Sequence, residues 1–157
     1  MKTKNTVGQK APDFALLDSE GKERSLSGLL KEGDVVLHFF PLAFSGVCTK
    51  QMCSVRDNMK MYKSLGAMPV GISVDSYFTL NAFKKAQNLN FLLLSDFNKE
   101  TAAGYGVLNK DYYGMKGVAR RAVFVIGKDG TVKHQQVLDD ADHLPDLKGM
   151  LQALKKS

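Results

Sequence analysis

Four short apolar runs are the feature that most constrains the fold of this chain. The first is Val35–Phe40, which Pro41 stops, and the others are Met68–Val74, Phe91–Leu94 and Ala122–Ile126. Apolar runs of this length are typical of strands that are covered on both faces. They alternate with segments of helical pattern. This order predicts an α/β domain with a central β-sheet.

Helical spacing marks the segments between these runs. Apolar residues recur at three- and four-residue steps, which places each set on one helix face: Met52, Val55, Met59 and Tyr62; Phe78, Ala82 and Phe83; Leu144, Leu147, Leu151 and Leu154. Ser76 is the expected N-cap of the second helix, and Pro145 suits the first turn of the last one. A further short helix is expected from Asp96 to near Gly104.

One hairpin is also expected late in the chain. Lys128, Asp129 and Gly130 form a turn signal that leads into Thr131–Leu138. Asp-Gly between two extended runs is a strong hairpin indicator. A meander therefore follows the crossover connections, so the sheet should be mixed.

Size and charge exclude several classes of protein. A chain of 157 residues suits one domain, residues 1–157. The net charge of +6 is spread out, without the block of five or six like charges that marks a nucleic-acid tail, so we expect a solvated basic surface and no nucleic-acid partner. No apolar run approaches the ~20 residues that cross a bilayer. The N-terminal residues lack the apolar stretch of a secretory signal, so we expect a cytoplasmic protein with reduced cysteines.

Both cysteines lie in one short stretch, PLAFSGVCTKQMCSVRD, as Cys48 and Cys53. The spacing differs from the C-x-x-C of a dithiol redox centre. Two cysteines alone cannot close a zinc site, and we expect no metal and no cofactor. Cys48 follows the first strand and falls at the start of the next helix, where unpaired N–H groups and the helix dipole stabilise a thiolate.

The second sulfur cannot reach the first while that helix is intact. Residues five apart in an α-helix are roughly 8–9 Å apart at Cα and point about 140° away from each other. A disulfide needs Cα atoms within about 7 Å. Cys53 is therefore either a core residue, or it meets Cys48 only after the first helical turns unwind, which helix ends do at low cost.

Residues Pro41 to Cys48 match a known motif, P-x-x-x-[TS]-x-x-C, and the chain resembles the peroxiredoxins through it. The C-x4-C spacing is similar to that of the peroxiredoxin Q type, also called bacterioferritin comigratory protein. The stretches PLAFSGVC, GISVDS and LLSDFN also resemble the alkyl hydroperoxide reductase E type. The resemblance extends from about Val7 to Leu138.

This resemblance implies a thioredoxin-like fold, a central mixed β-sheet flanked by α-helices, and a thiol-dependent reduction of hydroperoxides. Cys48 would be the peroxidatic cysteine, Ser45 would bind the peroxide oxygens and Pro41 would cover the thiolate. Arg121, directly before the Ala122–Ile126 run, would supply the fixed cation that holds the thiolate and the polarised peroxide.

The resemblance also assigns Cys53 and the partners. Cys53 would be the resolving cysteine, which attacks the sulfenic acid and closes an intramolecular disulfide. Thioredoxin or a glutaredoxin would then reduce that disulfide. Relatives of these types are monomers or homodimers, and we expect one of these two states. Two rival functions stay open: a thioredoxin-like thiol–disulfide oxidoreductase, which lacks its C-x-x-C here, and a non-catalytic thiol redox sensor.

A few positions depart from the pattern of the relatives. Gln51 stands where a glutamate commonly orients the arginine, and Leu92 stands where a proline is usual. His38 replaces an aromatic residue in the first strand, and we expect it to be a buried, hydrogen-bonded core residue. His134 and His143 have polar neighbours, which predicts surface positions.

Overall fold

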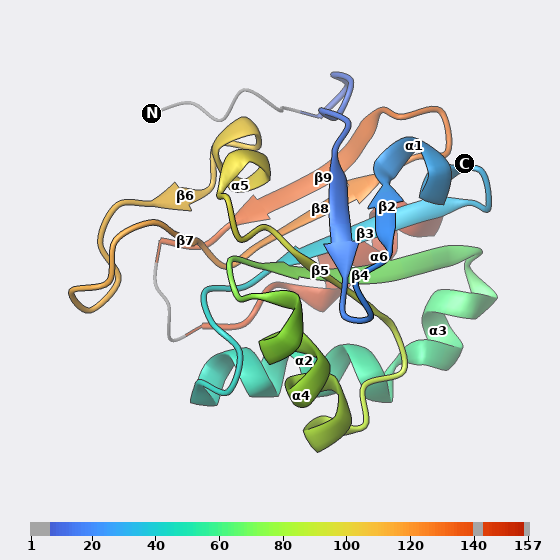
Figure 1. Cartoon of the computed structure of the whole chain (residues 1–157). Coiled ribbons are helices and arrows are strands. Elements are labelled where there is room, and N and C mark those ends of the chain that lie inside the picture. Colours follow the sequence, from blue (N-terminus) through green and yellow to red (C-terminus); the bar gives the residue numbers. More distant parts are fainter. Residues whose placement is uncertain (1–6, 140–142, 156–157) are drawn as a thin grey trace.

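A seven-stranded mixed sheet with helices on both faces forms the frame of the protein (Figure 1). The structure is a computed structural model, and it describes residues 7–139 and 143–155. The strand order is β2-β1-β5-β4-β3-β8-β9. The strands are β1 Ala15–Asp18, β2 Glu23–Ser25, β3 Asp34–Phe39, β4 Ala67–Ser73, β5 Leu92–Ser95, β8 Ala122–Ile126 and β9 Val132–Val137. A separate two-stranded ribbon pairs β6 Leu108–Asn109 with β7 Val118–Ala119.

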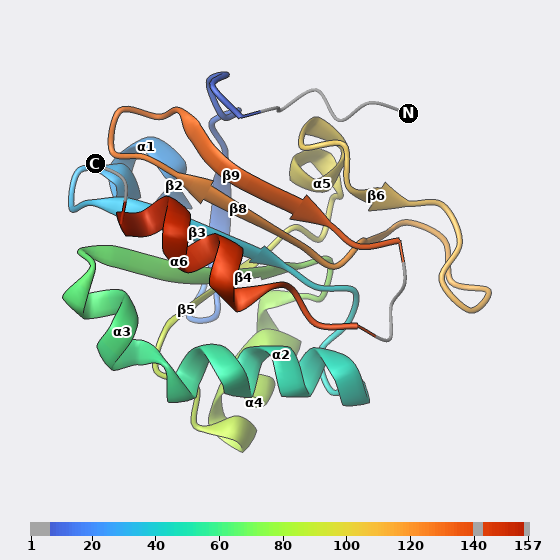
Figure 2. The same ribbon diagram turned by 180° about the vertical axis from the view of Figure 1, so that it is seen from behind.

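The helices divide between the two faces of the sheet. They are α1 Leu26–Leu30, α2 Gly46–Asp57, α3 Met59–Ser64, α4 Tyr77–Gln87, α5 Glu100–Gly104 and α6 Leu147–Lys155. One buried cluster joins α1 and α5 to the sheet, and a second joins α2, α3, α4 and α6 to the opposite face. Figure 2 shows α6 lying across that second face, beside α2 and α3.

Strand β3 sits between a parallel and an antiparallel neighbour, which makes the predicted sheet mixed. It pairs parallel with β4 and antiparallel with β8. Its side chains alternate between the two buried clusters, with Leu37 and Phe39 in one and Val36 and Phe40 in the other. A strand covered on both faces explains the continuous apolar run that the sequence shows. The predicted hairpin into β9 is also present.

The predicted first helix is two consecutive helices in the structure, and the predicted buried face continues from one to the other. The α2 helix ends at Asp57 and α3 begins at Met59, with Asn58 between them at φ −109° and ψ 17°. Met52, Val55 and Tyr62 are nevertheless all buried, as the spacing predicts. The periodicity identified the buried side chains but not the point where one helix becomes two.

The predicted face of α4 was wrong at two of its three residues. Phe78 is 70% exposed and Ala82 is also exposed, whereas Phe83 is fully buried as predicted, together with Leu80. The Ser76 cap is confirmed, since its hydroxyl accepts a hydrogen bond from the Thr79 backbone N–H. Once the cap fixes the helix start, the packing of Leu80 and Phe83 against the sheet leaves Phe78 in solvent.

The last two predicted helices begin later than expected. Pro145 and Leu144 precede α6, and Leu144 and Leu147 are exposed; Met150, Ala153 and Leu154 make the buried face. Likewise, α5 begins at Glu100, and the buried Asp96 lies before it. The Asp96 carboxylate accepts hydrogen bonds from two backbone N–H groups of that helix.

Within residues 7–139 and 143–155, the longest and most apolar helices are still too short or too polar to traverse a bilayer. The same residues contain no cluster of three or more His, Cys, Asp or Glu side chains that could hold a metal ion.

Candidate active site

The turn from β3 into α2 places Cys48 in the first turn of the helix, as predicted. Ser45 occupies the N-cap position with extended backbone, so Cys48 is the third helical residue. Its side chain is fully buried. The first turn of a helix carries partial positive charge from its N–H groups, so this position in the helix favours a thiolate.

The loop before the helix is held in an unusual backbone conformation. Phe44 has a φ of 70°, the left-handed region that non-glycine residues seldom adopt. Its ring packs 5.1 Å from the ring of Phe83 on α4. The Ala43 backbone N–H donates to the Asp75 carboxylate at 2.7 Å, and Ser73 donates to the same carboxylate. These contacts fix the loop to the end of β4 and to α4, and so fix the position of Cys48.

Arg121 brings a buried cation to the sulfur. It directly precedes β8, which pairs with β3, and its side chain is only 1% exposed. Its Nη1 atom lies 3.4 Å from Cys48 Sγ. A guanidinium at this distance, away from bulk water, stabilises negative charge on the sulfur more strongly than an exposed cation would. The predicted pairing of Cys48 with Arg121 is present in the structure.

Gln51 orients the arginine. The Arg121 Nη1–H donates to Gln51 Oε1 at 2.7 Å, so one nitrogen contacts both the amide oxygen and the sulfur. The Gln51 Nε2–H group reaches the Phe39 carbonyl at 3.5 Å, a long contact. A neutral amide fixes the direction of the guanidinium without neutralising its charge.

Ser45 and Pro41 lie at the mouth of the same turn. Pro41 is buried directly beyond the end of β3. The Ser45 hydroxyl makes no capping bond to the helix and instead donates to the Leu42 carbonyl at 3.0 Å. The hydroxyl therefore remains half-buried at the loop and keeps its lone pairs for another donor.

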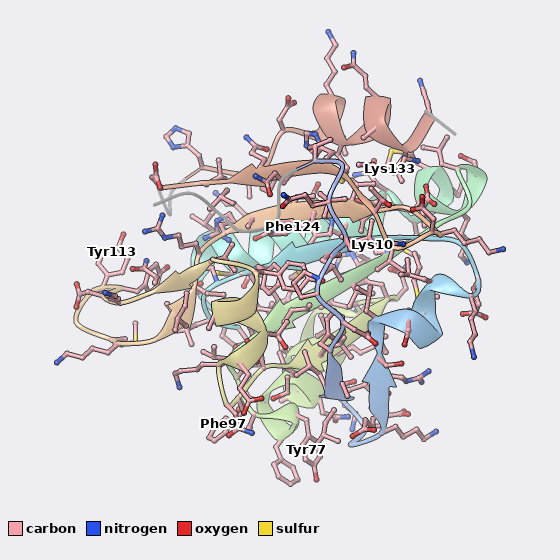
Figure 3. The ribbon with its side chains drawn as sticks, turned by 90° about the horizontal axis from the view of Figure 1, so that it is seen from above. Lys10, Tyr77, Phe97, Tyr113, Phe124 and Lys133 are labelled. Atoms are coloured by element: carbon pink, nitrogen blue, oxygen red, sulfur yellow. The ribbon has the colours of Figure 1, made fainter. Side chains whose placement is uncertain are left out.

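Tyr112 is a site residue that the sequence analysis missed. It lies in the ribbon formed by β6 and β7, where a tight turn through Tyr113 and Gly114, both with positive φ, is closed by two backbone hydrogen bonds between Tyr112 and Met115. Figure 3 shows Tyr113 projecting away from the protein at the end of this ribbon.

The Tyr112 hydroxyl is close to three predicted site residues. Burial raises the pKa of Tyr112, and the charge of Cys48 raises it further; the Arg121 cation and a hydrogen bond with the Ser45 side chain lower it. No motif or helical spacing marks Tyr112, because only the folding of the ribbon brings it to the turn before α2.

Cys53 lies further along the same helix. Both cysteines are free thiols, and α2 is continuous from Gly46 to Asp57. The half-buried Cys53 thiol donates to Gln87 Oε1 on α4 at 3.5 Å, and Arg56 Nη1 donates to the Gln87 carbonyl at 2.6 Å. The two sulfurs therefore lie on one intact helix, and the second half of that helix is hydrogen-bonded to Gln87 of α4.

The histidines and Leu92, which the sequence analysis also named, lie outside the Cys48 turn. His38 is buried and hydrogen-bonded to Tyr62, as predicted. His143 is exposed, as predicted, but His134 is only half-buried and burial lowers its pKa. Leu92 is a half-buried residue of β5.

Comparison with known proteins agrees with this arrangement. A profile of the AhpC/TSA family matches residues 7–135. The chain is 36% identical to the chloroplastic peroxiredoxin Q of Sedum lineare over 97% of its own length and 81% of that protein. It is 39% identical to a peroxiredoxin named bcp from Coxiella burnetii, covering 80% and 84% of the two chains.

A solved structure shows the same fold. The crystal structure of peroxidoxin BcpB from Mycobacterium tuberculosis superposes with a TM-score of 0.83 at 33% identity, covering 96% of this chain and 94% of that one. The expected thioredoxin-like fold and the resemblance to the peroxiredoxin Q type are both confirmed. The chain belongs to the AhpC/TSA family, and it is a peroxiredoxin.

Proposed function

We propose that Cys48 is the sulfur at which this thiol peroxidase reduces hydroperoxides. The observation that carries the proposal is the buried Cys48 sulfur at the start of α2, 3.4 Å from Arg121 Nη1. The thiolate attacks the terminal peroxide oxygen, an S–O bond forms and the O–O bond breaks. The sulfur is oxidised to a sulfenic acid, and the leaving oxygen takes a proton and departs as water or an alcohol.

Arg121 and Ser45 assist this step. The guanidinium lies where negative charge moves from sulfur to the departing oxygen, which is the charge that a fixed cation stabilises best. The Ser45 hydroxyl, half-buried at the same turn, donates its proton to the Leu42 carbonyl and keeps lone pairs that can accept a hydrogen bond from the peroxide O–H. Pro41 limits the access of water to the thiolate.

Cys53 resolves the sulfenic acid. Its thiol attacks the oxidised sulfur of Cys48, water leaves and a disulfide forms within the chain. The separation of the two cysteines along α2 requires the helix to open between them first, and the contact of Cys53 with Gln87 must break. A thioredoxin or glutaredoxin dithiol then restores both thiols by exchange.

We propose the remaining properties from the sequence. Residues 1–157 act as one domain in the cytoplasm, as a monomer or a homodimer, without a nucleic-acid or membrane partner. Sedimentation of the reduced and oxidised protein tests the oligomeric state, and a retained nucleic acid in the purified protein would contradict the proposed partners.

The catalytic proposal is tested by mixing reduced protein with hydrogen peroxide and a thioredoxin system and following NADPH consumption. Steady turnover that Cys48→Ser abolishes supports a peroxidase. A single round of oxidation without turnover by any dithiol reductant would instead show a redox sensor.

A further inference from the structure

A cavity lies behind the active-site helix, on the side away from the loop that carries Ser45. It has a volume of about 220 Å³ and is lined by residues of β3, α2, α3, α6 and the segment that leads into α6, among them His38, Gln51, Tyr62 and Met150. Figure 2 shows these helices beside one another on this face of the sheet. Two of the lining side chains, His38 and Gln51, are buried and polar.

The contacts of His38 are compatible with a proton on Nε2. This nitrogen lies 3.1 Å from the Tyr62 hydroxyl oxygen, and that hydroxyl lies 3.6 Å from Met150 Sδ, to which it can donate. We assign the single hydroxyl proton to the Met150 contact, so that the hydroxyl accepts from His38 and Nε2 carries the hydrogen; the ¹⁵N measurement below tests this tautomer. Nδ1 is then a lone-pair acceptor.

That acceptor has no protein donor within the residues described. Nδ1 is buried and forms no hydrogen bond with any of them. Burial lowers the pKa of His38 to about 4, so the ring is neutral near pH 7. Nδ1 therefore carries no proton at that pH and still needs a hydrogen-bond donor. A buried acceptor without a donor destabilises the folded state, because it has lost its hydrogen bonds to water.

Gln51 presents the complementary group. Because its Oε1 accepts from Arg121, its amide nitrogen must point away from the arginine. One of the two N–H groups reaches the Phe39 carbonyl, and only at 3.5 Å. Phe39 is the neighbour of His38 on β3, and the side chains of Gln51 and His38 both line the cavity. A buried donor and a buried acceptor thus line the same cavity.

We propose that the cavity binds water that accepts a hydrogen bond from Gln51 Nε2 and donates one to His38 Nδ1, which makes His38 a positioning residue for Arg121. Water is suited to this site because it donates and accepts at once, and it needs only about 30 Å³. The bridge holds the Gln51 oxygen on Arg121 and so holds the guanidinium at Cys48. The inference rests on the proposed role of Cys48.

If this water bridge forms, the effect of His38 on Arg121 depends on which residue occupies position 51. A glutamate at position 51 has no N–H group to satisfy, and its charge would hold Arg121 directly. The imidazole should therefore matter only when residue 51 is an amide. This dependence distinguishes a positioning role from simple packing, which would be the same with either residue.

The test is His38→Phe, which keeps a ring but removes both nitrogens, made in the native chain and together with Gln51→Glu. In the native chain we expect the rate of Cys48 oxidation by hydrogen peroxide to fall roughly three- to tenfold, the loss expected from one hydrogen bond. With Gln51→Glu present, the same change should have less than half that effect on a logarithmic scale. His143→Phe, the same substitution at an exposed histidine that does not line the cavity, should leave the rate unchanged.

A second measurement uses the wild-type protein, so it does not require that any variant fold. In histidine-labelled wild-type protein, the ¹⁵N spectrum should show a neutral His38 with the proton on Nε2 and an Nδ1 that accepts a hydrogen bond. A proton on Nδ1, or a His38→Phe loss that is equal in both backgrounds, would overturn the inference. If the wild type did not oxidise at Cys48, the proposed function would fail instead, whatever the state of His38.

Discussion

Replacement of Arg121 by methionine tests how much of the reaction depends on the buried cation. Arg121→Met keeps most of the length of the side chain and removes its charge. The two atoms that matter, Nη1 and Cys48 Sγ, are 3.4 Å apart. With an effective dielectric constant of about 20, Coulomb's law gives an attraction of about 5 kcal/mol at that distance, which is an upper bound. A hydrogen bond to a charged group contributes about 1.5–3 kcal/mol, which is the lower bound.

These bounds place the loss between about 1.5 and 5 kcal/mol, or roughly ten- to several-thousandfold in the rate of Cys48 oxidation. The assay is stopped-flow oxidation by hydrogen peroxide, with the ultraviolet absorbance of the thiolate recorded before mixing. Arg121→Lys is the matched control, because it retains the charge but not the planar fork that contacts both Gln51 and the sulfur. It should lose less than the methionine variant.

Removal of a buried arginine also leaves the Gln51 oxygen without its donor, so the fold must be checked by thermal unfolding. If Arg121→Met remains folded and oxidises within threefold of the wild-type rate, the guanidinium does not hold the thiolate or the peroxide. The reasoning from the 3.4 Å contact would then be refuted.

Three further predictions concern other parts of the site. Tyr112→Phe should slow Cys48 oxidation roughly three- to tenfold, as one lost hydrogen bond predicts, whereas Tyr113→Phe, at a neighbouring side chain that is 72% exposed, should not; equal effects in the two would exclude a role for the Tyr112 hydroxyl. Cys53→Ser should leave that first oxidation intact but stop turnover with thioredoxin, and turnover at the wild-type rate would remove Cys53 from the mechanism. The pKa of His38 falls from 6.5 to about 4 on folding, so the unfolded chain binds the extra proton between these values and stability decreases as the pH is lowered through them, by about 3 kcal/mol in total. Urea unfolding at several pH values checks this, and His38→Phe should remove that part of the slope.

The sheet was predictable where its strands are buried on both faces. β3 and β8 appear in the sequence as unbroken apolar runs because both sides of each strand meet a packed cluster. The hairpin of β1 and β2 was missed because β2 is three residues of mostly polar character, Glu23–Ser25. Phe78 was wrongly placed on the buried face of α4 because it is apolar yet exposed, and hydrophobic spacing alone cannot distinguish it from Leu80.

The site residues likewise differ in whether the sequence could predict them. Cys48 and Ser45 belong to one motif, which pointed to both, whereas Arg121 directly precedes a recognisable strand and was predicted from the resemblance to the peroxiredoxins. Tyr112 lies in a ribbon that is distant in sequence from Ser45, and only the folded structure brings the two side chains into contact. The cavity beside Gln51 is likewise a product of packing between elements.

The central claim is that Cys48 is the sulfur that attacks the peroxide, and trapping of the first oxidation product tests it most directly. Reduced Cys53→Ser protein is treated with one equivalent of hydrogen peroxide in the presence of dimedone, and the labelled residue is identified by peptide mass spectrometry. The account predicts near-complete sulfenic acid labelling at Cys48. Consumption of the peroxide without a label at Cys48 would contradict it.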